Sequence, residues 1–415
     1  MEKLVGSLLS KAGFYVFIER RSQGGNSLRV RVSSTPVKAP VDRIDYFFVL
    51  PGGLQPAVMD RIVSKTKVVG DVGTVTRCSP KLREREAVIV ELPLMVRLKE
   101  MNCGAHEAEA LAGAAVALLG LSADSVNVLL EGRVEDSEVS SVKTAFRLGH
   151  ALGVEMDENV LVARYLRSDK KEILMDAGTA ISLGTAAGGC NFVASHSLFS
   201  GTLFDFYADN SERFGTVAFR AEDGLGALNM CVGASYAGAR ALFAASDTHS
   251  VDEAIETAAL SETPLVIHAV PGCGTMSCLG HGGLPHVVYA PVSVESAFTL
   301  GAQAFATAEK FRIPVVLMAD PCLSEVAYDA EPSLPDGEKD NIPEGLPGLV
   351  LKTYTDKRVE KRAALLDSAL PPKLFGDPDY RTLIVFWGFL QEILLEALHV
   401  AEAEGRFDTR SVAVL

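Results

Sequence analysis

Two short apolar runs constrain the fold of this 415-residue chain more than any other feature. Residues 264–270 and 313–319 are almost wholly apolar, yet each is far too short to cross a membrane. Runs of this kind predict strands that are buried on both faces, as in a parallel sheet covered by helices on either side. Because such strands alternate with Ala- and Gly-rich helical segments, the sequence predicts an α/β protein with a doubly wound sheet.

The chain divides into several predicted segments. Residues 1–153 predict a first α/β domain, and residues 154–173 predict a charged, irregular link. The doubly wound domain is expected at 174–325, a Pro- and acid-rich linker or arm at 326–380, and the truncated start of a third α/β domain at 381–415. A single βαβ unit at the end cannot bury both faces of its sheet, so we expect either a neighbouring chain or a longer sequence.

The expected elements follow from apolar periodicity and from Gly and Pro punctuation. In the first domain they are strands at 14–18, 28–33, 45–50, 66–71 and 87–91 and helices at 104–120 and 137–152. In the second they are helices at 177–188, 227–239 and 292–310 and strands at 192–195, 241–245, 264–270, 286–290 and 313–319.

Charge and cysteine usage exclude several classes of protein. The net charge of −14 argues against nucleic-acid binding, because an acidic surface repels a phosphate backbone. The seven cysteines are scattered and form no CxxC pair, which indicates reduced thiols in a cytosol and predicts no metal site and no iron–sulfur cluster in this chain. No signal peptide and no membrane span are expected, so the sequence predicts a cytoplasmic protein.

Common catalytic motifs are missing from the sequence. There is no GxGxxG, Walker A, HExxH or GxSxG pattern. One local alternative is an enzyme of changed chemistry built on the loop at 271–283, with Cys273, Cys278 and His281 as its candidates. His281 is more readily explained as a structural residue, since it lies in a Gly-His-Gly turn.

Four stretches in the second domain resemble the pyrimidine-binding domain of 2-oxoacid:ferredoxin oxidoreductase α subunits. They are AEDGLGALNMCVGASYAGARA (221–241), SETPLVIHAV (261–270), GHGGLPHVVYAPVSVESAF (280–298) and AEKFRIPVVLMAD (308–320). TAISLGTAAGGCNFVASHS (179–197) resembles the opening of that domain, and RTLIVFWGFLQEILLEAL (381–398) resembles the start of the next one. RSQGGNSLRVRVSSTPVKAP (21–40) and IDYFFVL (44–50) resemble a γ-type domain that is often fused ahead of it.

The resemblance implies oxidation of a 2-oxoacid with thiamine diphosphate, coenzyme A and ferredoxin. In this family the α subunit supplies a carboxylate to the aminopyrimidine ring and grips the substrate. A β-type partner supplies the Mg-diphosphate site and an iron–sulfur cluster. The resemblance therefore implies a hetero-oligomer that shares thiamine diphosphate and Mg with its partner and reaches ferredoxin through the complex.

The family's functional positions are altered in this sequence. Where the family has its activating Glu this chain has Gly224, and the nearest carboxylate is Glu222, two residues earlier and about 200° around the expected helix, pointing away from the family position. The substrate loop begins with His196 and Ser197, our candidates for substrate binding, and has Phe199 in place of the family's Thr. Ser246 alone survives from a Ser-Gly-Pro-Gly loop and is our cofactor-binding candidate.

The γ-type segment departs from the family as well. Only residues 22–27 of its second Gly-rich loop remain, which weakens the expectation of coenzyme A binding. Two interpretations of all these departures remain open. In the first reading the chain is an α-type subunit in which Glu222 or a partner residue assists thiamine. In the second it is a non-catalytic structural or regulatory paralogue, a pseudoenzyme that keeps the scaffold for subunit assembly.

Overall fold

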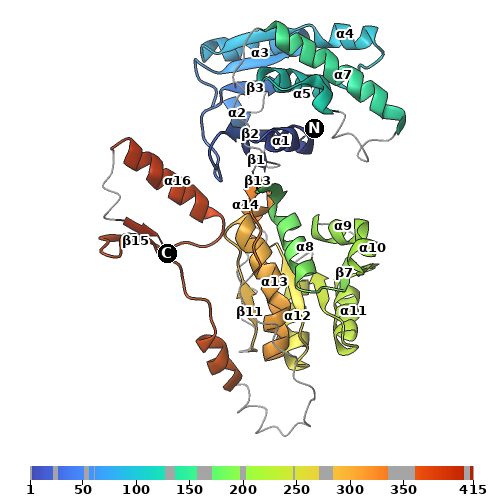
Figure 1. Ribbon diagram of the computed structural model, residues 1–415, viewed down its shortest axis with the longest axis vertical. Helices are drawn as coiled ribbons and strands as arrows, with labels where there is room; N and C mark the ends of the chain where they lie inside the picture. The colour runs from blue at the N-terminus through green and yellow to red at the C-terminus, as the bar shows by residue number, and fades with distance from the viewer. Residues whose placement is uncertain are drawn as a thin grey trace. The chain divides into compact units, whose positions relative to one another are not determined.

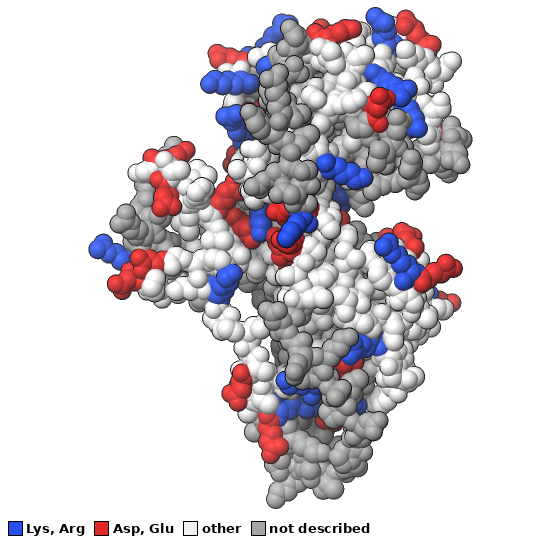
Figure 2. Space-filling view, in the orientation of Figure 1, with Lys and Arg blue, Asp and Glu red and all other residues white. Residues whose placement is uncertain are grey.

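The computed structural model of the chain separates into two compact units, residues 1–174 and 175–415, and each is described by itself (Figure 1). The structure describes residues 2–21, 27–50, 56–59, 61–126, 136–156, 171–196, 202–245, 248–270, 284–334, 360–405 and 412–414. Among these residues no helix combines the length and the apolar character that crossing a bilayer requires. On the face shown in Figure 2, acidic and basic side chains are interspersed.

The first unit contains a β-hairpin and a small parallel sheet. Its strands are β1 (Tyr15–Arg21), β2 (Ser27–Ser33), β3 (Tyr46–Val49), β4 (Lys67–Asp71) and β5 (Val88–Leu92). Its helices are α1 (Glu2–Lys11), α2 (Pro56–Met59), α3 (Val72–Glu84), α4 (Leu94–Glu100), α5 (Glu107–Leu118) and α7 (Asp136–Glu155), with a 3-10 turn η1 (Ala123–Val126). The strands β1 and β2 pair antiparallel, whereas β3, β4 and β5 form a parallel sheet in that order.

Small residues let α5 and α7 pack closely. A Cβ added to Gly113 would meet the backbone of Phe146, and one added to Gly149 would meet the backbone of Ala110. Glycine is costly inside a helix, so its presence at both positions is explained by this close backbone approach.

The second unit is built around a six-stranded parallel sheet in the order β11-β12-β10-β9-β7-β8. Its strands are β7 (Phe192–His196), β8 (Val217–Ala221), β9 (Ala241–Ala244), β10 (Val266–Ala269), β11 (Val287–Tyr289) and β12 (Val315–Met318). The helices are α8 (Ala177–Ala187), α9 (Thr202–Asp209), α10 (Ser211–Phe214), α11 (Gly224–Tyr236), α12 (Thr248–Leu260), α13 (Val294–Phe311) and α14 (Pro321–Ser324).

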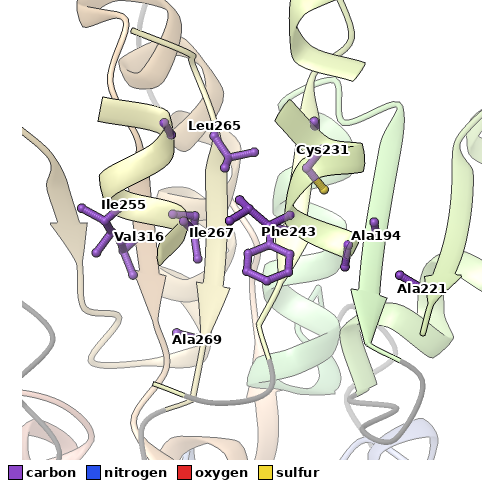
Figure 3. Packing of buried hydrophobic residues seen from close by; sticks show 14 of the residues in the cluster. Ala194, Ala221, Cys231, Phe243, Ile255, Leu265, Ile267, Ala269 and Val316 are labelled. Atoms are coloured by element: carbon purple, nitrogen blue, oxygen red, sulfur yellow. The ribbon is translucent and has the colours of Figure 1, made fainter. Parts of the chain in front are cut away.

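Figure 3 shows a hydrophobic cluster on the face of this sheet that α11 and α12 cover. Phe243, Ile267 and Val316 come from three neighbouring strands and pack with Cys231 of α11 and Ile255 of α12. The strands alternate their side chains between faces, so the residues between these point to the opposite face, where α8 and α13 pack together. This burial on both faces explains why β10 and β12 are near-continuous apolar runs.

The remaining strands of this part of the chain are shorter. They are β6 (Ile173–Asp176), β13 (Val326–Ala330), β14 (Phe375–Gly376), β15 (Thr382–Ile384) and β16 (Val412–Val414), and α16 (Leu390–Ala403) lies between the last two. Val326–Ala330, at the start of the segment expected to be a linker, forms a fully buried strand. The strands β15 and β16 pair in parallel, as the predicted βαβ unit requires.

The fold class predicted from the sequence is confirmed in its main feature, a parallel α/β sheet with helices on both faces. The helix expected at 227–239 instead begins at Gly224 and ends at Tyr236. The carboxylate of Asp223 caps it by accepting a hydrogen bond from the Gly226 backbone N–H at 2.6 Å. The placement of the domain boundaries stays a prediction.

Candidate functional site

The order of strands in the large sheet locates the candidate site. From β7 the chain moves outward to β8, and it then crosses to the other side of β7 to form β9. The connections that follow β7 and β9 therefore leave in opposite directions. In open α/β sheets, ligands bind at such a switch point, outside the carboxyl ends of the strands.

Glu222 follows the last residue of β8 at this edge. Its side chain is exposed, and it precedes Asp223, the N-cap of α11. The expectation that Glu222 lies on a helix about 200° from residue 224 is wrong, because the helix begins only at Gly224. The side chain of Glu222 is therefore positioned by the β8–α11 loop.

His196 lies at the same edge on the neighbouring strand. It is the last residue of β7, pairs in register with Ala221 of β8 and is half-buried. The structure thus brings His196 and the segment carrying Glu222 to adjacent strand ends. Ser197, Phe199 and Ser246 lie outside the described residues, as do Cys273, Cys278 and His281.

His268 is a polar residue at this edge that the sequence did not single out. It is the penultimate residue of β10 and pairs with Ala244 of β9 and Leu317 of β12. Burial lowers the pKa of its imidazole to about 4, so the ring is uncharged at neutral pH. A single histidine inside an apolar run predicts a core residue, and nothing in the sequence reveals its position beside the switch point.

A further carboxylate at the sheet edge, Asp320, has a structural role. It follows β12, and its Oδ1 accepts a hydrogen bond from the Cys322 backbone N–H at 2.8 Å, at the start of α14. Its Oδ2 accepts a second from the Phe389 backbone N–H at 3.0 Å. Both oxygens are therefore engaged by the backbone.

The described residues hold no group of three or more His, Cys, Asp or Glu side chains arranged to bind a metal ion. Two cysteines of the second unit are also poor ligands or nucleophiles. Burial raises the pKa of the Cys190 thiol to about 12, and it raises that of Cys231 as well. Both thiols therefore stay protonated at neutral pH.

A comparison with protein families matches residues 200–347 to the pyruvate flavodoxin/ferredoxin oxidoreductase domain described as thiamine diphosphate-binding. This stretch includes β8, α11 and His268. The chain is also 30% identical over 165 residues to the 2-oxoglutarate synthase subunit KorA of Archaeoglobus fulgidus, covering 35% of this chain and 48% of that protein. It is 24% identical over 442 residues to the 2-oxoacid:ferredoxin oxidoreductase subunit alpha of Saccharolobus solfataricus, covering 85% of this chain and 69% of that protein.

The fold matches a solved structure along its whole length. The 2-oxoglutarate:ferredoxin oxidoreductase from Magnetococcus marinus, solved with 2-oxoglutarate, coenzyme A and succinyl-CoA bound, superposes with a TM-score of 0.79. The match covers 100% of this chain and 84% of that one at 19% identity. The match with the KorA subunit spans about half of that protein's length.

Proposed function

We infer that this chain, which belongs to the family of 2-oxoacid:ferredoxin oxidoreductase α subunits, works in a complex that oxidatively decarboxylates a 2-oxoacid. The observation that carries the proposal is the match of residues 200–347 to a thiamine diphosphate-binding domain, a stretch that includes β8, β9 and β10 beside the switch point. The identity of the 2-oxoacid is left to experiment.

We assign the pyrimidine end of thiamine diphosphate to this edge. When bound, the cofactor supplies the electron sink that decarboxylation requires. Glu222 is the proposed carboxylate for the pyrimidine, because it is exposed at the end of β8 and position 224 holds a glycine. His196 and Ser197 are proposed to contact the substrate, because His196 is the last residue of β7 and Ser197 is the next residue in the sequence. Ser246 is proposed to contact the cofactor, because it comes two residues after β9 in the sequence.

A partner subunit is part of the proposal. Following the resemblance to the family, we assign the Mg-diphosphate site and an iron–sulfur cluster to a β-type partner. Electrons would reach ferredoxin through that partner. We propose coenzyme A as a substrate of the whole complex and assign no coenzyme A-binding residue to this chain. That the first unit is a γ-type domain is likewise a proposal.

One observation favours the alternative of a non-catalytic assembly subunit. Glu222 is held only by the loop before α11, and residue 224 at the helix start has no side chain to reach a ligand. A base must contact the atom on which it acts, so an exposed loop carboxylate is a weaker candidate than one fixed on a helix. The choice between the readings depends on whether Glu222 contributes to cofactor binding.

The test is calorimetric titration of thiamine diphosphate with Mg²⁺ into the complex co-purified from native cells. We expect saturable binding by the wild type and binding about tenfold weaker for Glu222→Ala, as for the loss of one charge-assisted hydrogen bond. Glu256→Ala, which removes an exposed glutamate from α12, is the matched control and should bind like the wild type.

Ferredoxin reduction with coenzyme A and a panel of 2-oxoacids then tests turnover by the same complex. A stable complex that binds no thiamine diphosphate would contradict the catalytic proposal and favour the assembly subunit. Equal binding by the wild type and Glu222→Ala would remove Glu222 from the site.

A further inference from the structure

A row of side chains crosses the large sheet at the switch point. Parallel register places Ser195 of β7 beside Ala244 of β9, Ala244 beside His268 of β10, and His268 beside Leu317 of β12. Residues in register on neighbouring strands point to the same face. This face is opposite to the one that carries Phe243, Ile267 and Val316. His268 is therefore the ionisable member of a row that is otherwise small or apolar.

The neighbours of His268 in this row leave its ring without a partner. Ser195 is 2% exposed, and its hydroxyl donates to the Ala244 carbonyl oxygen at 3.0 Å. Ala244 and Leu317 have no polar side-chain atom to offer. The backbone carbonyl of His268 accepts a hydrogen bond from the Ala245 N–H at 2.9 Å, but no hydrogen bond or ion pair to the ring occurs within the described part of the chain.

Three other half-buried histidines do have a partner, whereas His196 at the end of β7 is like His268 in having none among the described residues. His150 Nε2 lies 2.7 Å from the Leu121 carbonyl oxygen, and His286 Nδ1 lies 3.0 Å from that of Leu284. His106 lies 3.7 Å from a carboxylate oxygen of Glu109. A half-buried ring without a protein partner keeps its donor and its acceptor available to water or to a ligand.

The charge state of His268 restricts what it can bind. Its surroundings favour the neutral imidazole, which carries one N–H donor and one bare nitrogen acceptor. A neutral ring offers no charge to a carboxylate or a diphosphate. It suits an uncharged heteroaromatic ring with donors and acceptors of its own, and the apolar row beside it suits the faces of such a ring.

We propose that His268 binds the aminopyrimidine ring of the cofactor through a hydrogen bond at the carboxyl ends of β9 and β10. This inference rests on the proposed function, since it takes the matched domain to bind thiamine diphosphate. It adds a binding residue that lies apart from Glu222, on the other side of the switch point.

The first test is titration of the wild-type complex and of His268→Phe with thiamine diphosphate and Mg²⁺, and with the hydroxymethyl aminopyrimidine fragment of thiamine. We expect His268→Phe to weaken binding of both about tenfold, and His268→Gln, which keeps a donor and an acceptor, to weaken it less. His399→Phe, which replaces an exposed histidine on α16, is the matched control and should change neither affinity.

The second test needs no substitution at His268. Ring nitrogen NMR signals of His268 in the wild-type protein should shift when the pyrimidine fragment binds. If the wild type binds thiamine diphosphate and His268→Phe binds it equally well, the inference is wrong while the proposed function stands. If the wild-type complex binds no thiamine diphosphate, both are wrong. Unshifted ring signals at saturating fragment would also overturn the inference.

Discussion

Glu107, the first residue of α5, is only 6% exposed, and its Oε1 has no hydrogen-bond partner among the described residues. Burial raises the pKa of its carboxyl group, the nearby Asp71 raises it further, and Arg77 opposes both. Asp71 is itself fixed, because its Oδ2 accepts from the Gly73 N–H at 3.0 Å and its Oδ1 from the Met95 N–H at 2.8 Å. The carboxylate form of Glu107 is therefore a destabilising feature of the first unit.

The raised pKa of Glu107 sets the direction in which the stability of the protein changes with pH. Below the unfolded pKa of a glutamate, Glu107 is protonated in both states and carries no penalty. As the pH rises through the raised folded pKa, the folded protein must ionise a buried group and loses stability. Glu107→Gln should therefore stabilise the protein by about 1 kcal/mol near pH 8 and by less near pH 4. Urea unfolding at both pH values measures this, with the exposed Glu100→Gln as control. Equal effects at the two pH values would contradict the prediction.

At the scale of elements, the N-terminus of α16 is anchored to Asp320, the residue that caps α14 in the same unit. Phe389 is 3% exposed, and its N–H donates to the Asp320 carboxylate at 3.0 Å. Gly388 adopts φ +76°, and a Cβ there would collide with Oδ2 of Asp320. The adjoining Trp387 is the single tryptophan of the chain and is 42% exposed, so it reports on this anchor.

Gly388→Ala should detach the anchor. We expect a red shift of the Trp387 emission and easier quenching by iodide, because the substitution adds a collision to the backbone strain of a positive φ. Gly405→Ala is the matched control, since Gly405 has φ +63° but no described atom within 4 Å of its added Cβ. Identical spectra for wild type and Gly388→Ala would show that the anchor does not depend on this glycine.

Elements differ in how far the sequence predicts them. The strands β10 and β12 are predicted well because burial on both faces forces an apolar run. The start of α11 is missed because Gly224 and Gly226 are poor helix formers, and only the Asp223 cap explains why the helix begins there. The strand β13 is missed because Pro- and acid-rich residues follow it directly.

For the whole molecule, the sequence predicts the sheet but not the order of its strands, because order depends on crossovers that leave no local pattern. The candidate site depends on that order. Glu222 and His196 were found through a resemblance, and the structure adds that they lie at the ends of the neighbouring strands β8 and β7. His268 required the structure, since the absence of a partner for a half-buried ring cannot be read from residue types.

The helix α11 indicates where a partner subunit would pack. None of its residues is charged, although Leu225, Met230 and Tyr236 are exposed, and a solvent-facing helix normally carries charge on its outer face. Val217 and Phe219 of the edge strand β8 extend this apolar surface. Helical glycines elsewhere in the chain lie against a neighbouring helix, as Gly184 of α8 lies against the backbone of Phe298. Gly233 of α11 differs, because no described atom comes within 4 Å of a Cβ added there.

We therefore expect Met230→Glu to prevent assembly with the proposed β-type partner. Met230 and Gly233 lie three residues apart on one face, so a carboxylate there would be buried without a counter-charge in the interface. The isolated chain should keep its circular dichroism spectrum and melting temperature, because Met230 is 39% exposed. Leu260→Glu, which places the same charge on an exposed leucine of α12, should leave the complex intact. Co-purification followed by size-exclusion chromatography measures both variants, and an intact complex with Met230→Glu would place the partner on another surface.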